Sequence, residues 1–234
     1  MAWGAAAYSI PELLNRIAQF AMEHSLIIPL KAGCSWVRCQ MMGPEDSNFD
    51  ARRMGPPPYD KAQLPNRMSP IGVPMFYGAC DLDTALAEIA EEPGRFAAAT
   101  FATTRDVLVL DLRTTPPVPS LFDVEKAKDR PIAQFMGSFI EDFRAPIDRN
   151  EKPHIDYLPT QIITEYFRTI VTSPQNQSIE GVLYSSTKNG REAIVLFAEN
   201  DDVVSGDEDE FSDRKPWLKM VTYEEVEYTP SKKN

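Results

Sequence analysis

Three residues with useful chemistry lie within the stretch 66–88. Arg67 can hold an anion through forked, charge-assisted hydrogen bonds, and Tyr77 can stack on a planar ring. Glu88 lies among small residues that would let a ligand approach closely, so its carboxylate could face a cleft. Taken singly, Glu88 would be an ordinary acid on a helix surface, Tyr77 a core aromatic and Arg67 a surface residue. Their combination is the first sign of a site.

The pattern around these residues predicts three successive elements: a loop, a strand and a helix. The apolar run 73–77 has the length of a short buried strand. Asp81 is a good N-cap for a helix that begins at Leu82, and Pro93 would end this helix after Glu92. The helix would then serve to place one carboxylate.

The rest of the sequence predicts helices and strands that do not alternate regularly. Amphipathic patterns predict helices at 9–25, 129–143 and 157–170. Apolar runs predict strands at 35–39, 96–103, 107–112, 181–186, 193–197 and 217–228, with 96–103 and 107–112 as a pair and a hairpin turn at 188–190. The Pro-rich segment 42–65 is expected to be an extended loop. We therefore predict an α+β fold with a mixed, largely antiparallel sheet and flanking helices.

The chain is long enough for one sizeable domain with a small extension. It has 234 residues, of which 43% are hydrophobic. We expect residues 1–30 to form an N-terminal helical extension. Residues 31–234 would form the main domain, with insertions near 113–157 and 200–214, the second of them acidic.

Charge and cysteine content argue against several kinds of function. The net charge of -11, without a basic stripe, argues against nucleic-acid binding. Three cysteines without CxxC spacing and two histidines argue against a zinc site, so we expect no metal. No apolar run reaches the ~18 residues of a membrane span, and the N-terminus lacks a signal-peptide pattern. We expect a cytoplasmic protein with reduced thiols and no membrane contact.

Several blocks of the sequence, in their order, resemble the RES domain family, which is named for its arginine, glutamate and serine. The blocks are Arg38 in an early strand, Arg67-Met-Ser-Pro-Ile-Gly-Val-Pro-Met-Phe-Tyr77, Thr84-Ala-Leu-Ala-Glu88, Tyr157-Leu-Pro-Thr-Gln161, Gly181-Val-Leu-Tyr-Ser-Ser186 and Val195-Leu-Phe197. The resemblance implies an ADP-ribosyltransferase-like fold and an enzyme that consumes NAD as its substrate and needs no cofactor. It also implies that the protein is a toxin with an antitoxin protein as partner. It is compatible with assembly into a homo-oligomer.

The resemblance further implies roles for individual residues. Glu88, Arg38 and Ser186 are expected to be catalytic, and Arg67, Tyr77, Ser185 and Tyr184 to bind the substrate. Loss of nicotinamide leaves positive charge on the ribose, which an ionised Glu88 would stabilise. Arg38 and Arg67 would pair with the pyrophosphate, and the sequence leaves open which of them is essential.

Three functions are compatible with this interpretation. The first is cleavage of the nicotinamide–ribose bond with transfer of ADP-ribose to water or phosphate, by an NAD glycohydrolase or an NAD phosphorylase. The second is an ADP-ribosyltransferase that modifies a macromolecule. The third is a non-catalytic module that binds NAD or a partner. The combination of arginine, tyrosine, glutamate and serine favours an enzyme, because a binding module does not need all four.

Overall fold

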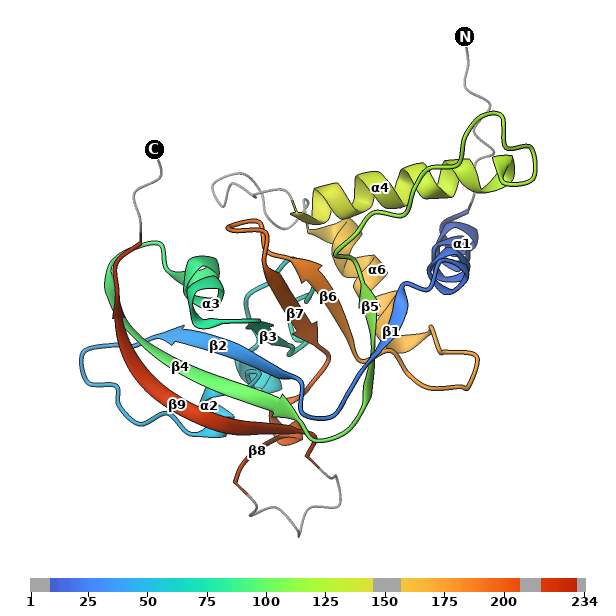
Figure 1. Ribbon diagram of the computed structural model, residues 1–234. Coiled ribbons are helices and arrows are strands. Elements are labelled where there is room, and N and C mark those ends of the chain that lie inside the picture. Colours follow the sequence, from blue (N-terminus) through green and yellow to red (C-terminus); the bar gives the residue numbers. More distant parts are fainter. Residues whose placement is uncertain (1–8, 145–156, 207–215, 231–234) are drawn as a thin grey trace.

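The computed structural model describes residues 9–144, 157–206 and 216–230, in which helices flank an open sheet (Figure 1). The nine strands of this sheet follow the order β1-β5-β6-β7-β3-β2-β4-β9-β8. The pairs β5–β6 and β8–β9 are parallel, and the other neighbours are antiparallel. The predicted α+β fold with a mixed, largely antiparallel sheet is confirmed, while the relation to ADP-ribosyltransferases stays a prediction.

Most of the predicted elements are present with shifted ends. The helices are α1 (Ile10–Glu23), α2 (Ala51–Met54), α3 (Leu82–Ile89), α4 (Arg130–Arg144) and α6 (Leu158–Thr169), with short 3-10 turns η1 (Tyr59–Lys61), η2 (Ala127–Asp129) and η3 (Asn200–Asp202). The strands are β1 (Ile27–Leu30), β2 (Ser35–Met41), β3 (Phe76–Ala79), β4 (Gly94–Thr103), β5 (Val107–Asp111), β6 (Gly181–Ser185), β7 (Glu192–Leu196), β8 (Val203–Ser205) and β9 (Leu218–Tyr228). The predicted hairpin of β6 and β7 is confirmed.

One antiparallel ribbon forms the frame of the sheet. Ile27 to Leu30 pair with Leu110 to Val107, and Ser35 to Met41 then pair with Ala102 to Phe96 in the same register. Residues 27–41 and 96–110 are therefore the two edges of a single long ribbon. It bends where the chain passes from β1 to β2, and Gly33 there has a φ of 88°.

The bend explains why the predicted pairing of 96–103 with 107–112 was wrong. Strands β4 and β5 follow one another along the same edge of the ribbon, so they pair with β2 and β1 instead of with each other. Asp106 reinforces the bend by accepting hydrogen bonds from the backbone of Ala32 at 2.9 Å and from Lys31 Nζ at 2.8 Å. Strands β6, β7 and β3 then connect β5 to β2 across the bend.

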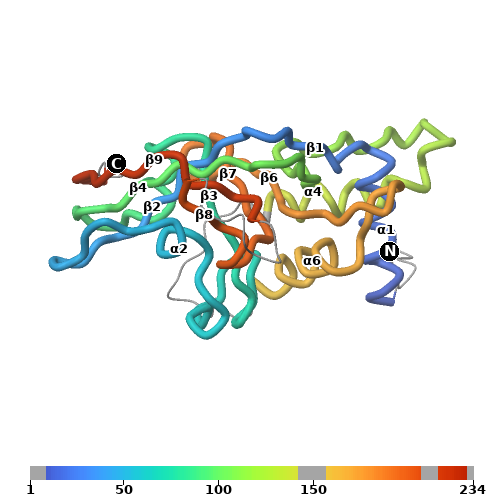
Figure 2. The backbone as a smooth tube through the Cα atoms, turned by 90° about the horizontal axis from the view of Figure 1, so that it is seen from below, coloured from blue at the N-terminus to red at the C-terminus, as the bar shows by residue number. Residues whose placement is uncertain are grey.

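The segment 42–65 was predicted as an extended loop, and part of this prediction was wrong. It contains α2, which begins because the Asp50 carboxylate accepts the backbone N–H of Arg53 at 2.7 Å. Phe49 and Met54 are buried under the sheet, so this segment contributes to the core. Figure 2 shows the connection from α2 to β3, in cyan and teal, on the same side of the sheet as α6.

The buried side chains form three clusters on the two faces of the sheet. Helices α1, α4 and α6 pack on β5, β6 and β7, with Phe20, Met136 and Phe167 among the buried residues. Helix α2 packs against the central strands β3 and β7 in the second cluster. Helix α3 packs on β2 and β4 in the third. Helix α1 therefore shares the main core. Residues 1–8 of the predicted extension, and residues 145–156 and 207–214 of the two predicted insertions, lie outside the described residues.

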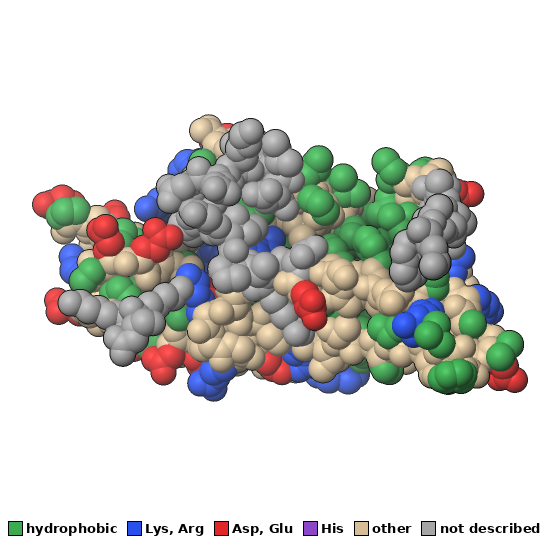
Figure 3. Space-filling view, turned by 90° about the horizontal axis from the view of Figure 1, so that it is seen from above, with side chains coloured by type: hydrophobic (Ala, Val, Ile, Leu, Met, Phe, Trp, Pro, Cys, Tyr) green, Lys and Arg blue, Asp and Glu red, His purple; other side chains and the backbone are tan. Residues whose placement is uncertain are grey.

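The connection from β5 to α4 leaves large apolar side chains in solvent. Leu121, Phe122 and Val124 are 71%, 92% and 85% exposed. Figure 3 shows hydrophobic side chains gathered on the half of the molecule that carries α1 and α4.

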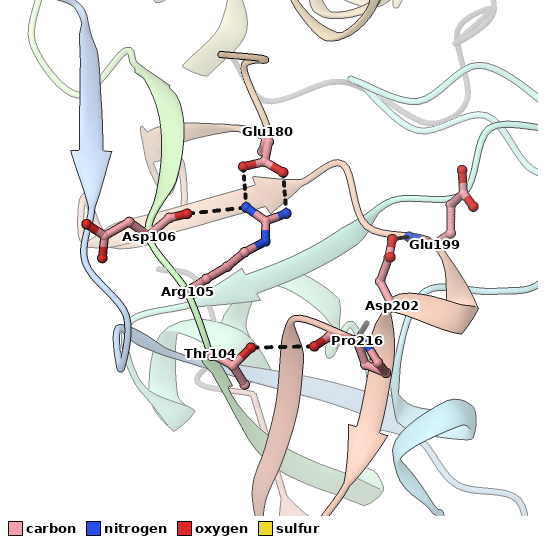
Figure 4. Close-up of polar contacts among 7 residues, drawn as sticks. All are labelled: Thr104, Arg105, Asp106, Glu180, Glu199, Asp202 and Pro216. Carbon is pink, nitrogen blue, oxygen red and sulfur yellow. Dashed lines mark hydrogen bonds and ion pairs between the residues drawn. The ribbon is translucent and has the colours of Figure 1, made fainter. Parts of the chain in front are cut away.

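Arg105 braces the bend against two distant parts of the chain (Figure 4). Its guanidinium donates two hydrogen bonds, of 2.7 and 2.5 Å, to the Glu180 carboxylate just before β6. It also lies over the Trp217 ring, 4.8 Å from the centroid, just before β9. The Thr104 hydroxyl donates to the carbonyl of Pro216 at 3.5 Å. These contacts join the bend of the ribbon to both halves of the sheet.

We expect Arg105→Gln to lower the free energy of unfolding by about 1–2 kcal/mol, because it removes a bidentate ion pair and a cation–π contact that are partly exposed. Denaturant unfolding would measure this loss. Arg95→Gln is the matched control, since Arg95 makes a single ion-pair contact of 2.9 Å with the exposed Glu225. An equal loss in both variants would contradict the bracing role.

Candidate active site

Helix α3 places Glu88 beside the hairpin of β6 and β7. Its N-terminus is capped by Asp81, whose Oδ1 accepts the N–H of Thr84 at 2.8 Å and its hydroxyl at 2.9 Å. The predicted cap is confirmed. The helix ends at Ile89, earlier than the predicted Glu92, since residue 90 already has an extended backbone.

The hairpin brings Ser186 to Glu88 across 98 positions of sequence. Ser186 Oγ donates a hydrogen bond to Glu88 Oε1. The backbone N–H of Lys188 donates to Ser186 Oγ at 3.2 Å, which leaves the hydroxyl proton for the carboxylate. Ser186 is 3% exposed, whereas Glu88 is half-buried. The structure therefore joins two of the three predicted catalytic residues in one contact.

Arg67 and Tyr184 lie in the electrostatic neighbourhood of this pair. Burial lowers the pKa of Arg67, while Tyr157, Tyr184 and Glu88 act in the opposite direction. Burial raises the pKa of Tyr184, and the charge of Glu88 adds to this rise. Tyr184 thus keeps its proton at neutral pH. Arg67, Tyr184 and Glu88 therefore belong to one cluster of polar residues, which act on one another electrostatically.

The loop that carries Arg67 is held by the first turn of α6. Thr160 Oγ1 donates to the carbonyl of Arg67 at 2.5 Å. Gln161 Nε2 donates to the carbonyls of Asn66 and Ser69 at 2.8 and 3.2 Å. Buried side chains thereby satisfy backbone carbonyls that have no sheet partner. The sequence block 157–161, at the start of α6, therefore positions the loop that begins the block 67–77.

Tyr77 is anchored to the same loop. Its hydroxyl lies 3.0 Å from Ser69 Oγ, and burial raises its pKa to about 12. The strand that carries it, β3, begins at Phe76, so the prediction of a strand from 73 was shifted by three residues. Tyr77 and Tyr184 pack against the same cluster as α4 and α6, on one face of the sheet.

Arg38 occupies a gap between β2 and β3. The ladder of these strands has one pair, Val37 with Ala79, and beyond it Arg38 Nη1 donates to the carbonyl of Tyr77 at 3.1 Å. Its guanidinium lies 5.6 Å from the centroid of the Phe76 ring. Burial lowers the pKa of Arg38 to about 10, although Tyr77 acts in the opposite direction. Arg38 Nε is buried and makes no hydrogen bond among the described residues.

Most of the predicted site residues lie together, and Arg38 lies apart from them. Glu88, Ser186, Tyr184 and Arg67 form one group, which Tyr77 joins through the Arg67 loop and through its effect on the pKa of Tyr184, whereas Arg38 donates to the backbone carbonyl of Tyr77. Alternation along β2 puts Arg38 on the face of the sheet opposite α3, because its neighbours Val37 and Cys39 pack with that helix. Ser185 pairs with Glu192 in β7, and it alternates with Tyr184 and Ser186.

Sequence reasoning did not single out Thr84, Asn189, Thr160 and Gln161 as individual residues, although each makes a contact at this site. Thr84, Thr160 and Gln161 lie within the blocks that carry the family resemblance. Asn189 had a weaker signal, because a hairpin turn alone explains an asparagine there.

Other kinds of site can be assessed in the ranges 9–144, 157–206 and 216–230. No group of three or more His, Cys, Asp or Glu in them could hold a metal ion. A hollow of about 390 Å³ lies beside Arg105, Glu180 and Gln177, and shares no residue with the candidate site. Arg38 and Arg67 are partly buried, and burial lowers the pKa of both; an anionic ligand would offset the cost of burying these cations.

Comparison with known protein families matches residues 36–218 to the RES domain. The chain belongs to the RES domain family. The resemblance drawn from the sequence blocks is thereby confirmed, and the match extends into β9. Membership is consistent with an NAD-related, toxin-like enzyme function. A comparison with curated proteins finds no match.

A membrane-spanning helix was not expected for this RES domain protein. In the part of the chain that the structure describes, no helix has both the length and the apolar character needed to cross a bilayer.

We expect Gln161→Ala to destabilise the Arg67 loop by about 0.5–1.5 kcal/mol, because the carbonyl of Asn66 loses its side-chain donor, while the carbonyl of Ser69 keeps the backbone N–H of Asn66. Denaturant unfolding would measure the loss. Gln63→Ala is the matched control, since Gln63 donates to a single carbonyl, that of Asp60, at an exposed position. If both variants had the same stability, α6 would not be holding the loop.

Proposed function

We propose that this RES domain protein cleaves the nicotinamide–ribose bond of NAD and transfers ADP-ribose to water or phosphate. The observation that carries the proposal is the hydrogen bond from Ser186 to Glu88, within electrostatic range of Arg67, in a chain of this family. The family is consistent with NAD chemistry, and the arrangement supplies a carboxylate, a hydroxyl and a cation together.

Glu88 is the group that we assign to the reacting ribose. Nicotinamide is cationic while bound to ribose and leaves as a neutral molecule, so its departure needs no strong acid. The main demand is stabilisation of positive charge on the ribose, which a carboxylate in a low dielectric meets well. Ser186 binds Oε1 and so orients the carboxylate, with Oε2 assigned to the ribose.

Arg67 suits the pyrophosphate, whereas Arg38 lies on the face of the sheet opposite α3 and would reach the substrate only beyond the Tyr77 carbonyl that it holds. Burial lowers the pKa of Arg67, which means that the surroundings disfavour its cation relative to water. A bound dianion would offset this cost and accept forked hydrogen bonds. At a pKa of about 10, Arg38 is still a cation at neutral pH. Tyr77 and Tyr184 are assigned to the rings of the substrate, and Ser185 is the weaker candidate for a contact.

The decisive experiment is an assay of nicotinamide release from NAD by purified protein. We expect release by the wild type and a loss of at least about 100-fold in kcat for Glu88→Gln, because the amide keeps the shape but removes the charge. Glu92→Gln, just beyond the same helix, is the control and should retain activity.

Two outcomes would overturn the proposal: no nicotinamide release by the wild type, or equal release by Glu88→Gln. Comparing the products with and without phosphate identifies the acceptor. ADP-ribose in both cases indicates a glycohydrolase, and a phosphorylated product that depends on phosphate indicates a phosphorylase. Labelled NAD that marks a macromolecule would instead favour an ADP-ribosyltransferase.

We also propose that the protein acts as a toxin whose effect is loss of NAD, with an antitoxin protein as partner. Family membership supports this role. Expression of the wild type in bacteria should arrest growth and lower cellular NAD, whereas Glu88→Gln should do neither. Growth arrest by both forms would separate toxicity from NAD cleavage.

A further inference from the structure

We propose that Thr84 and Asn189 are positioning residues that attach the β6–β7 turn to α3 and thereby hold Ser186 on Glu88. The inference rests on the proposed function of the Ser186–Glu88 pair. Asn189 Nδ2 donates to Thr84 Oγ1 at 2.9 Å, and Ser186 Oγ donates to Glu88 Oε1. Two hydrogen bonds therefore join the turn to residues within α3 itself.

The two attachment points lie on one face of the helix. Thr84 and Glu88 are four residues apart in α3, so their side chains are neighbours separated by one helical turn. A single hydrogen bond between serine and glutamate would let the turn pivot about that contact. The second bond, from Asn189, opposes this rotation. Two-point attachment therefore fixes the direction from which Ser186 approaches the carboxylate.

Thr84 is itself held in place. It is 0% exposed, and its hydroxyl donates to Asp81 Oδ1 at 2.9 Å while it accepts from Asn189. The hydroxyl thus acts as donor and acceptor at once, and its rotamer is set by the helix cap. The β6–β7 turn is therefore fixed relative to the N-terminal end of α3.

Asn189 transmits this anchorage to Ser186 through the turn. Its Oδ1 accepts the N–H of Arg191 at 3.1 Å, while its amide nitrogen binds Thr84. The carbonyl of Arg191 accepts the N–H of Ser186 at 2.7 Å, and Gly190 N–H returns to the carbonyl of Ser186 at 2.9 Å. A displacement of Asn189 therefore displaces Ser186.

An exposed ion pair between the turn and the N-cap that precedes α3 provides a control. Arg191 Nε lies 3.0 Å from Asp81 Oδ2, and its side chain is 58% exposed. Exposed ion pairs contribute little, so Arg191→Gln should leave activity close to the wild type. It tests whether any loss of contact between turn and helix is sufficient to impair the site.

The kinetic test compares Thr84→Val, which keeps the shape and removes the hydroxyl, with Thr84→Ser, which keeps the hydroxyl. We expect Thr84→Val to lower kcat by about 10- to 100-fold with KM little changed, as a shift of about 1 Å would, and Thr84→Ser to retain activity. In a Ser186→Ala background Thr84→Val should cause no further loss. An equal loss in both backgrounds, or none in either, would overturn the positioning role.

Amide hydrogen exchange tests the attachment without reference to activity. In Thr84→Val the amides of Lys188 and Gly190 should exchange faster than in Thr84→Ser and Arg191→Gln. Unchanged exchange would overturn the attachment even if NAD is cleaved. Faster exchange in a protein that does not cleave NAD would refute the proposed function alone. If Thr84→Val does not fold, Asn189→Ala replaces it, because position 189 is exposed. The exchange of the Lys188 and Gly190 amides in Asn189→Ala is then compared with that in Arg191→Gln.

Discussion

The bend in the ribbon of residues 27–41 and 96–110 is the constraint on which the other strands depend. Both edges of the ribbon keep one register through the bend, so its two halves point in different directions. Strands β6, β7 and β3 then connect β5 with β2. Arg105 holds the bend to the segments before β6 and β9.

The site follows from this arrangement, because β3 leads directly into α3 and pairs with β7 of the hairpin. Glu88 and Ser186 therefore come from neighbouring parts of the sheet despite their distance in sequence. Close strand packing contributes as well. A Cβ atom at Gly181 would lie 2.5 Å from the carbonyl oxygen of Val195, so β6 can approach β7 here with glycine and with no larger residue.

Local electrostatics at the site differ from those of the chain as a whole. The protein carries a net charge of -11, yet it holds two partly buried cations, Arg38 and Arg67, whose pKa values are lowered by burial. Solvent and salt screen the surface carboxylates, whereas these partly buried cations are screened much less. An acidic protein can therefore offer an anionic ligand a favourable position.

The sequence by itself determined the fold class, most elements, the Asp81 cap and the family, because periodicity, capping residues and motif order are local properties. It also named Glu88 and Ser186, which the structure joins. Tertiary structure decided that β4 and β5 do not pair, that 42–65 contains a helix and that Arg38 lies away from α3. It also decided the contact of Asn189 with Thr84. These features depend on which distant segments meet, and side-chain spacing along one strand or helix carries no information about its partner.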